Sequence, residues 1–341
     1  MTRTSGGPGG RTPLRVAARL HGYPPRLNAG AEWMVHSMLR ALVERGHDAT
    51  VWLSRYSGDR EPYELDGVKV VPLQARLDFS SAVRQADVLL SHLENVQATG
   101  ALARGYGKPL VVVCHNTHAH SFRDMASGDT ALAVYNSAWM DRQAELFFTE
   151  YPKSVRPDTS LVVRPPVFAA EYRTRPGKKI TLINCNADKG GRLLEQLARR
   201  MPDTEFLAVA GAYGEQILPD LPNVEVVEHV SGHEMRERVY ARTRILLMPS
   251  FYESWGRAGV EALTSGIPVI AHPTPGLTES LADAGIFADR NDPDGYEAVL
   301  RKLQDPAEYR LASKRAKARS AELDPTTDLD AWCTAVEALA T

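Results

Sequence analysis

Short apolar runs alternate with helix-like stretches along almost the whole chain of 341 residues. The apolar runs have the length of buried strands, and the stretches between them have the composition and spacing of helices packed on a sheet. This alternation predicts an α/β protein in which helices wrap parallel sheets. We predict strands at residues 14–20, 49–53, 68–73, 88–92, 110–114, 131–135 and 161–163, and then at 180–185, 205–210, 224–228, 244–248, 268–271 and 285–287.

The predicted strands fall into two sets, separated by a charged stretch that carries proline and glycine. Such a stretch is typical of a linker between domains. We therefore predict a flexible tail at residues 1–13, a Rossmann-like domain at 14–165, a linker at 166–178, a second Rossmann-like domain at 179–320 and a C-terminal helix at 321–341. Two helices, 307–323 and 328–339, are expected on either side of Pro325, which breaks the helical pattern between them.

Composition excludes several classes of protein. The chain is 43% hydrophobic and 24% charged, with a net charge of -2, so we expect a globular protein and no nucleic-acid partner. Its three cysteines are widely spaced, which favours reduced thiols and a cytoplasmic location. The N-terminus lacks the apolar core of a signal peptide, and no segment is long and apolar enough to predict a membrane span.

The segment 249–271, PSFYESWGRAGVEALTSGIPVIA, carries the strongest functional pattern. A buried strand ends at Pro249, a loop carries Glu253, and a helix follows Gly256. Free N–H groups at a helix start favour a phosphate, while Glu253 and Glu261 can accept hydrogen bonds from hydroxyl groups. The pattern suits a diphosphate flanked by hydroxyls, as in a nucleotide sugar. The alternative is that the two glutamates are solvated, or complement the helix dipole.

This segment resembles the E-x7-E signature of retaining family 4 glycosyltransferases (glycosyl transferases group 1), with Trp255 where phenylalanine is usual. The resemblance implies the GT-B fold, in which two Rossmann-like domains face each other across a cleft and the last helix crosses back to the first domain. It also implies that Glu253 holds the donor sugar and that Glu261 holds the ribose hydroxyls. The first domain would then serve the acceptor, and the second would bind the nucleotide sugar.

A cation is expected next to the diphosphate. Lys189 follows a predicted strand and precedes a helix, so its charge suits a pyrophosphate. The family pattern has an arginine five residues earlier, where this chain has Asn184. Arg257 is a candidate substitute. The alternative for Lys189 is a solvated loop side chain.

Three further residues are assigned through the same resemblance. Gly30 lies in the loop before the helix predicted at residues 33–45 and matches one glycine of the family's first-loop pair, with Ala29 in place of the other. His115 follows a strand and matches a histidine that contacts the donor hexose. Val230 lies at a turn whose backbone contacts the base. His115 also begins an H-x2-H-x-H run whose spacing is compatible with zinc, an alternative that lacks a clear fourth ligand.

We therefore predict a metal-independent, retaining transfer of a hexose-like sugar from a nucleoside diphosphate donor, UDP or GDP, to a glycan, lipid, protein or small molecule. Lys189 and helix starts would stabilise the leaving diphosphate, while Glu253 and His115 orient the sugar. No cofactor is expected, and contact with a membrane surface stays open. The sequence Asp292-Pro293-Asp294 is interpreted as a turn and helix cap rather than a metal motif. The alternatives are a sugar-nucleotide epimerase, a phosphorylase-like enzyme, a metallohydrolase built on His115, His118 and His120, and an inactive nucleotide-sugar-binding protein.

Overall fold

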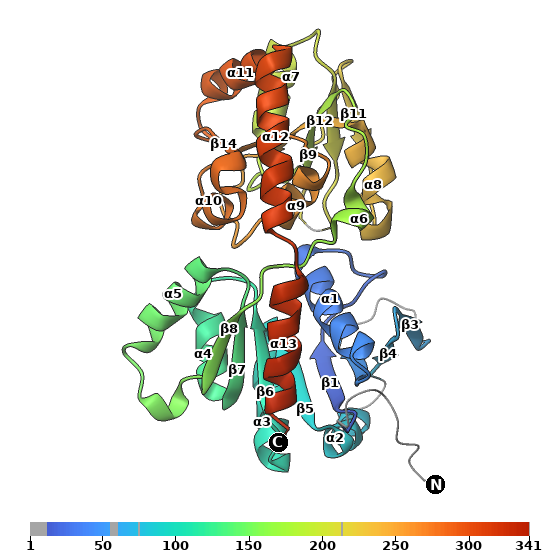
Figure 1. Cartoon of the computed structure of the whole chain (residues 1–341), viewed down its shortest axis with the longest axis vertical. Coiled ribbons are helices and arrows are strands. Elements are labelled where there is room, and N and C mark those ends of the chain that lie inside the picture. Colours follow the sequence, from blue (N-terminus) through green and yellow to red (C-terminus); the bar gives the residue numbers. More distant parts are fainter. Residues whose placement is uncertain (1–11, 55–60, 74–75, 213, 341) are drawn as a thin grey trace. The chain divides into compact units, whose positions relative to one another are not determined.

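The computed structural model describes residues 12–54, 61–73, 76–212 and 214–340. Contacts divide the chain into two compact units (Figure 1). Unit 1 contains the described residues up to Leu27, then Ala31–Val163 and the chain from Thr326 onward. Unit 2 contains Asn28–Gly30 and Arg164–Pro325. Except for its last two positions, the tail predicted at residues 1–13 lies outside the described residues.

Unit 1 is built on a sheet whose described part has eight strands in the order β3-β4-β2-β1-β5-β6-β7-β8. Neighbouring strands are parallel except for β3, which pairs antiparallel with β4 at the edge. The strands are β1 (Arg15–Leu20), β2 (Asp48–Leu53), β3 (Tyr63–Leu65), β4 (Val68–Pro72), β5 (Val88–His92), β6 (Leu110–Cys114), β7 (Thr130–Tyr135) and β8 (Thr159–Val162).

The helices of unit 1 include one from the far end of the chain. They are α1 (Gly30–Glu44), α2 (Arg76–Gln85), α3 (Val96–Tyr106), α4 (Ala119–Ser127), α5 (Ala138–Phe148) and α13 (Thr326–Ala338), with short turns η1 (Leu93–Asn95) and η2 (Lys153–Val155). Helix α13 packs on α1: Trp332 is fully buried and its Nε1 donates a 2.9 Å hydrogen bond to the carbonyl of Met38. Arg45 and Glu337 form an ion pair at 3.3 Å. The C-terminal helix therefore completes unit 1 (Figure 1).

Unit 2 is built on a sheet whose described part has six strands, all parallel, in the order β11-β10-β9-β12-β13-β14. Its first strand therefore lies in the middle, and the next strands are added first on one side and then on the other. This is the order of a doubly wound Rossmann-like sheet. The strands are β9 (Lys179–Ile183), β10 (Phe206–Val209), β11 (Val224–Val227), β12 (Thr243–Met248), β13 (Val269–Ala271) and β14 (Gly285–Phe287).

The helices of unit 2 begin within the segment predicted as a linker. Residues 166–178 contain α6 (Ala169–Tyr172), and Tyr172 is buried among residues of unit 2. The others are α7 (Gly191–Arg200), α8 (Met235–Arg238), α9 (Arg257–Thr264), α10 (Pro275–Leu281), α11 (Pro293–Lys302) and α12 (Pro306–Glu322), with short turns η3 (Gly232–Glu234), η4 (Tyr240–Arg242) and η5 (Ala282–Ala284). The Asp292 side chain accepts a hydrogen bond from the N–H of Gly295 at the start of α11, which confirms its predicted capping role.

The sheet of unit 2 is covered on both faces, as continuous apolar strands require. Leu246 and Leu247 are neighbours in β12, yet they belong to separate apolar clusters, because successive side chains of a strand point to opposite faces. A third cluster fills unit 1. The prediction of two parallel sheets is confirmed, and every predicted strand overlaps an observed one. Within the described residues, no helix has the length and apolar character needed to cross a membrane.

Candidate active site

The loops that follow β9 and β12 meet at one edge of the unit 2 sheet. The two strands are parallel neighbours, so their carboxyl ends lie at the same edge. The N–H of Phe251, after β12, donates a 2.8 Å hydrogen bond to the carbonyl of Asp188, after β9. The sheet order reverses direction between these strands. Open α/β sheets bind ligands at such a reversal, outside the carboxyl ends of the strands.

Lys189 and Glu253, one from each loop, are paired at this edge. Lys189 Nζ lies 2.5 Å from Glu253 Oε1 and 3.4 Å from the carbonyl oxygen of Tyr252. The Ser250 hydroxyl donates a 2.9 Å hydrogen bond to the same carboxylate oxygen. Both charged side chains keep access to solvent, since they are 27% and 17% exposed. The structure therefore brings together two residues that the sequence placed in the site separately.

Two glycines let the helices begin close to this pair. Gly190 and Gly256 precede α7 and α9, with φ angles of 99° and 84° in the left-handed region. A Cβ on Gly190 would lie 2.2 Å from Pro249 Cγ, and one on Gly256 would lie 2.4 Å from Leu277 Cδ2. Only glycine combines this φ with this lack of space. The starts of α7 and α9 are thereby held at the edge that carries Lys189.

Glu261 lies in a buried network rather than on an open surface. It is 5% exposed; its Oε1 pairs with Arg257 Nη1 at 2.6 Å, and its Oε2 accepts a 2.5 Å hydrogen bond from the hydroxyl of Tyr240. Burial raises the pKa of Glu261, against the opposing charge of Arg257. A carboxylate oxygen can accept more than one hydrogen bond, so the role of Glu261 at the ribose stays a prediction.

Arg257, the candidate substitute cation, is held by the same network. Besides Glu261, it donates a 3.0 Å hydrogen bond from Nη2 to the hydroxyl of Tyr172 and a 3.3 Å hydrogen bond to the carbonyl of Pro166. Its side chain is only 10% exposed. These contacts give Arg257 a structural task, which is to tie α9 to the segment around α6.

Trp255 and Val230 are core residues. Their side chains are 2% and 4% exposed and belong to the same apolar cluster. The hydroxyl of Ser280 donates a 2.6 Å hydrogen bond to the carbonyl of Trp255. Any part that these two residues take in donor binding would therefore come from their backbone atoms, as the sequence analysis expected for Val230.

Asn184 occupies the position at which the family pattern has an arginine. It directly follows β9, and its backbone is left-handed, with φ 66°. Its Oδ1 accepts a 3.3 Å hydrogen bond from Gln216 Nε2.

A cation that the sequence analysis did not predict contacts the loop after β9. Arg290 donates hydrogen bonds to the carbonyls of Ala187 and Asp188, at 2.9 and 3.1 Å. Arg290 lies three residues after β14, at the carboxyl end of a parallel strand. That position could have indicated a residue near the site.

In unit 1, His115 directly follows β6 and contacts the end of β5. Its Nε2 lies 3.0 Å from Nδ1 of His92. Burial lowers the pKa of His115 to about 4, although the Glu32 carboxylate opposes the shift, and burial also lowers the pKa of His92 well below its usual value. Both imidazoles are therefore neutral near pH 7.

Gly30, another predicted site residue, is the first residue of α1, and a Cβ there would meet nothing within 4 Å.

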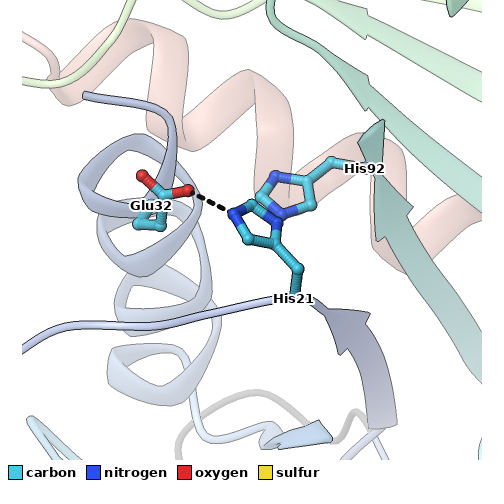
Figure 2. A group of neighbouring side chains, drawn as sticks. All are labelled: His21, Glu32 and His92. Atoms are coloured by element: carbon cyan, nitrogen blue, oxygen red, sulfur yellow. Dashed lines mark ion pairs between the residues drawn. The ribbon is translucent and has the colours of Figure 1, made fainter. Parts of the chain in front are cut away.

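The H-x2-H-x-H run does not form a metal cluster in the described part of the chain. His118 and His120 are exposed and stack on each other, with ring centroids 5.6 Å apart. A different group gathers instead: His21 after β1, Glu32 in α1 and His92 at the end of β5 (Figure 2). The sequence analysis did not predict this group, because its members are separated by 11 and 60 residues.

Comparisons with known proteins identify the family. The model described as "Glycosyl transferases group 1" matches residues 219–319, and that described as "Glycosyl transferase 4-like domain" matches residues 29–150. The D-inositol 3-phosphate glycosyltransferase of Nocardiopsis dassonvillei is 32% identical over 297 residues, which cover 71% of this chain and 69% of that protein. The chain belongs to the family 4-like glycosyltransferases of group 1. The family prediction is confirmed.

Two further matches differ in extent. The O-antigen chain mannosyltransferase B of Escherichia coli is 39% identical to this glycosyltransferase over 83 residues, or 24% of this chain and 22% of that protein. The Anabaena protein HepE, solved in complex with UDP-glucose, has a TM-score of 0.75 at 13% identity, covering 95% of this chain and all of that one. At this identity the likeness shows the fold, which is GT-B as predicted. The protein is thus a glycosyltransferase that uses a nucleotide-sugar donor.

Proposed function

We propose that this glycosyltransferase moves a hexose-like sugar from a UDP- or GDP-sugar to a hydroxyl acceptor, with retention of anomeric configuration and without a metal ion on the diphosphate. The observation that carries the proposal is the Lys189–Glu253 pair, at 2.5 Å, where the sheet order of unit 2 reverses. An ammonium group near helix starts suits a leaving diphosphate. The Anabaena protein of the same fold binds UDP-glucose, which favours UDP as the nucleotide.

From the Lys189–Glu253 pair we also infer the order of events during donor binding. Before the donor binds, the charge of Lys189 is neutralised by Glu253. An arriving diphosphate competes for the ammonium group, and its charge replaces that of the carboxylate. Glu253 is then released to accept hydrogen bonds from the sugar hydroxyls, while Ser250 continues to orient it. Lys189 thereby stabilises the charge that develops as the diphosphate leaves. The role of His115 at the sugar remains a prediction.

The acceptor class is the less constrained half of the proposal. The name of the Nocardiopsis relative favours a small phosphorylated polyol, and that of the Escherichia coli relative favours a glycan chain. Both present a hydroxyl nucleophile, so a panel of acceptors should contain both kinds. The three buried free thiols, Cys114, Cys185 and Cys333, support a reducing, cytoplasmic location.

Thermal unfolding with a panel of nucleoside diphosphates and their sugars tests the donor site. UDP or GDP should raise the melting temperature, since a bound ligand stabilises the folded chain. Release of the diphosphate should then be measured with each acceptor, and proton NMR of the anomeric signal should show retention. Activity should be the same with Mg²⁺, with Mn²⁺ and in EDTA. An inverted product, a C2 epimer, or binding without turnover would replace the proposal by one of its alternatives.

A further inference from the structure

His21, Glu32 and His92 converge at the reversal of the unit 1 sheet. Strand β1 lies between β2 and β5, so the chain continues to one side after β1 and returns to the other side at β5. His21 directly follows β1, His92 is the last residue of β5, and Glu32 lies in the first turn of α1. This is the place at which open α/β sheets bind ligands.

The three side chains are close enough to share one ion. Figure 2 shows them turned toward one another from the two strand ends and the helix. One ligand atom from each residue lies within 4.8 Å of the other two, and His21 Nε2 is 3.1 Å from Glu32 Oε1. Ligands of tetrahedral zinc, bound at about 2.0–2.1 Å, lie about 3.3 Å apart. Small side-chain rotations would therefore bring the donor atoms to bonding distance.

Two of the donor atoms are buried without a hydrogen bond. Glu32 is 2% exposed and His92 is fully buried, and neither Oε2 of Glu32 nor Nε2 of His92 has a hydrogen-bond partner among the described residues. Buried polar atoms are nearly always bonded, because losing water without replacement costs free energy. A cation in the cluster would satisfy both atoms. A purely structural hydrogen-bond network would leave them both unsatisfied.

His92 also has the kind of outer contact that metal-binding histidines use. His92 Nδ1 lies 3.0 Å from Nε2 of His115. In the tautomer of His92 that carries its proton on Nδ1, this contact is a hydrogen bond donated to His115, and the lone pair on Nε2 is available to the cluster. On the other histidine, Nε2 is the atom next to Glu32, and the charge of the Glu94 carboxylate lies 3.8 Å from Nδ1, beyond hydrogen-bond distance. An outer partner such as His115 fixes the orientation of a ligating imidazole.

We propose that His21, Glu32 and His92 bind one Zn²⁺ ion on unit 1. Two imidazoles and a carboxylate form a ligand set that zinc accepts, and three protein ligands leave a fourth position for water or another oxygen ligand. The sequence analysis expected no metal, and this site changes that expectation for unit 1. The proposal is independent of the donor chemistry in unit 2, because metal content and nucleotide binding are measured separately.

The test uses the whole chain without a histidine tag. After treatment with a chelator and dialysis, isothermal titration with ZnCl₂ and elemental analysis should give one zinc per chain. Glu32→Gln and His92→Gln should abolish this binding. His115→Gln removes only an outer contact and should weaken it about 10–100-fold. The matched control is the double variant His118→Gln/His120→Gln, which removes two exposed imidazoles of the same unit and should still bind one zinc.

Three outcomes would overturn the proposal: no zinc binding by the parent chain, equal binding by Glu32→Gln and His92→Gln, or loss of binding in the control. Circular dichroism should first show that each variant folds. Should the buried His92 variant not fold, Co²⁺ bound to the parent chain gives a test without a variant. A tetrahedral site of imidazole and carboxylate ligands should give visible d–d bands without thiolate charge transfer. Absence of those bands, or thiolate charge transfer, would likewise exclude the site.

Discussion

Replacing Lys189 by alanine should slow sugar transfer far more than it destabilises unit 2. Its ammonium group makes a 2.5 Å contact with Glu253 and, in the proposed function, the contact with the leaving diphosphate. A charge-assisted hydrogen bond contributes about 1.5–3 kcal/mol, so kcat/KM should fall by about ten- to a hundredfold. Partly exposed ion pairs contribute little to folding, and Glu253 keeps the Ser250 hydrogen bond, so we expect about 1 kcal/mol or less in unfolding free energy.

Lys179 provides a matched control at the other end of the same strand. It begins β9, and its Nζ lies 2.6 Å from Glu225 Oε2, with side chains 21% and 41% exposed. Lys179→Ala therefore removes an ion pair of similar length and exposure, but far along the strand from the proposed donor site. We expect its kcat/KM to equal that of the parent.

The assay is release of UDP or GDP from the preferred donor, with urea unfolding measured in parallel. A double-mutant cycle that combines Lys189→Ala with Glu253→Gln separates the pair from its individual contacts. If Lys189 served only to hold the loop, Lys189→Ala and Lys179→Ala would change kcat/KM equally. A loss of activity that merely tracked the loss of stability would also indicate that Lys189 only holds the loop. Either result would refute the assignment of Lys189 to the diphosphate.

Three further predictions concern stability and reactivity. Gly256→Ala should lower the unfolding free energy by at least about 1 kcal/mol, because Gly256 has a left-handed φ and the new Cβ would overlap Leu277. The control is Gly105→Ala, in a helix where a Cβ meets nothing within 4 Å, and it should not lower the unfolding free energy. Arg257→Met leaves Glu261 buried without its cation and should cost about 3–5 kcal/mol in urea unfolding, whereas breaking the exposed Arg301–Glu297 pair with Arg301→Ala should cost under about 1. The native thiols should not react with a disulfide reagent at about pH 8. Burial raises the pKa of all three cysteines to about 12, so their thiolates are scarce until the chain unfolds. Rapid reaction of any one cysteine in the folded chain would contradict this prediction.

The fold could be predicted well because most strands are continuous apolar runs. Strand β3 was missed since it is three residues long, lies at an edge and has none of its residues buried. The return of the last helix was expected only from the family resemblance. No local pattern in residues 326–338 shows which surface the helix covers, and that choice depends on contacts nearly 300 residues away in sequence.

The candidate site was predicted where one short segment carries it. Glu253, Gly256 and Glu261 lie within nine residues, so their spacing alone places them at one loop and helix start. Their surroundings could not be predicted in the same way. The contact of Glu261 with Tyr240, and the contacts of Arg290 with the 187–188 carbonyls, join elements that are distant in sequence. The histidine cluster of unit 1 was missed for the same reason.

The assignment of α13 to unit 1 has a consequence for how the chain is made. During synthesis, the helix that covers α1 with Trp332 emerges only after all of unit 2. Unit 2 is almost continuous in sequence, so it can bury its core while the ribosome is still adding residues after Pro325. The sheet of unit 1 is synthesised first, but part of α1 stays uncovered until α13 has been made. The N-terminal unit is therefore the last to be finished, and it is the one that a stalled or shortened translation product would leave exposed.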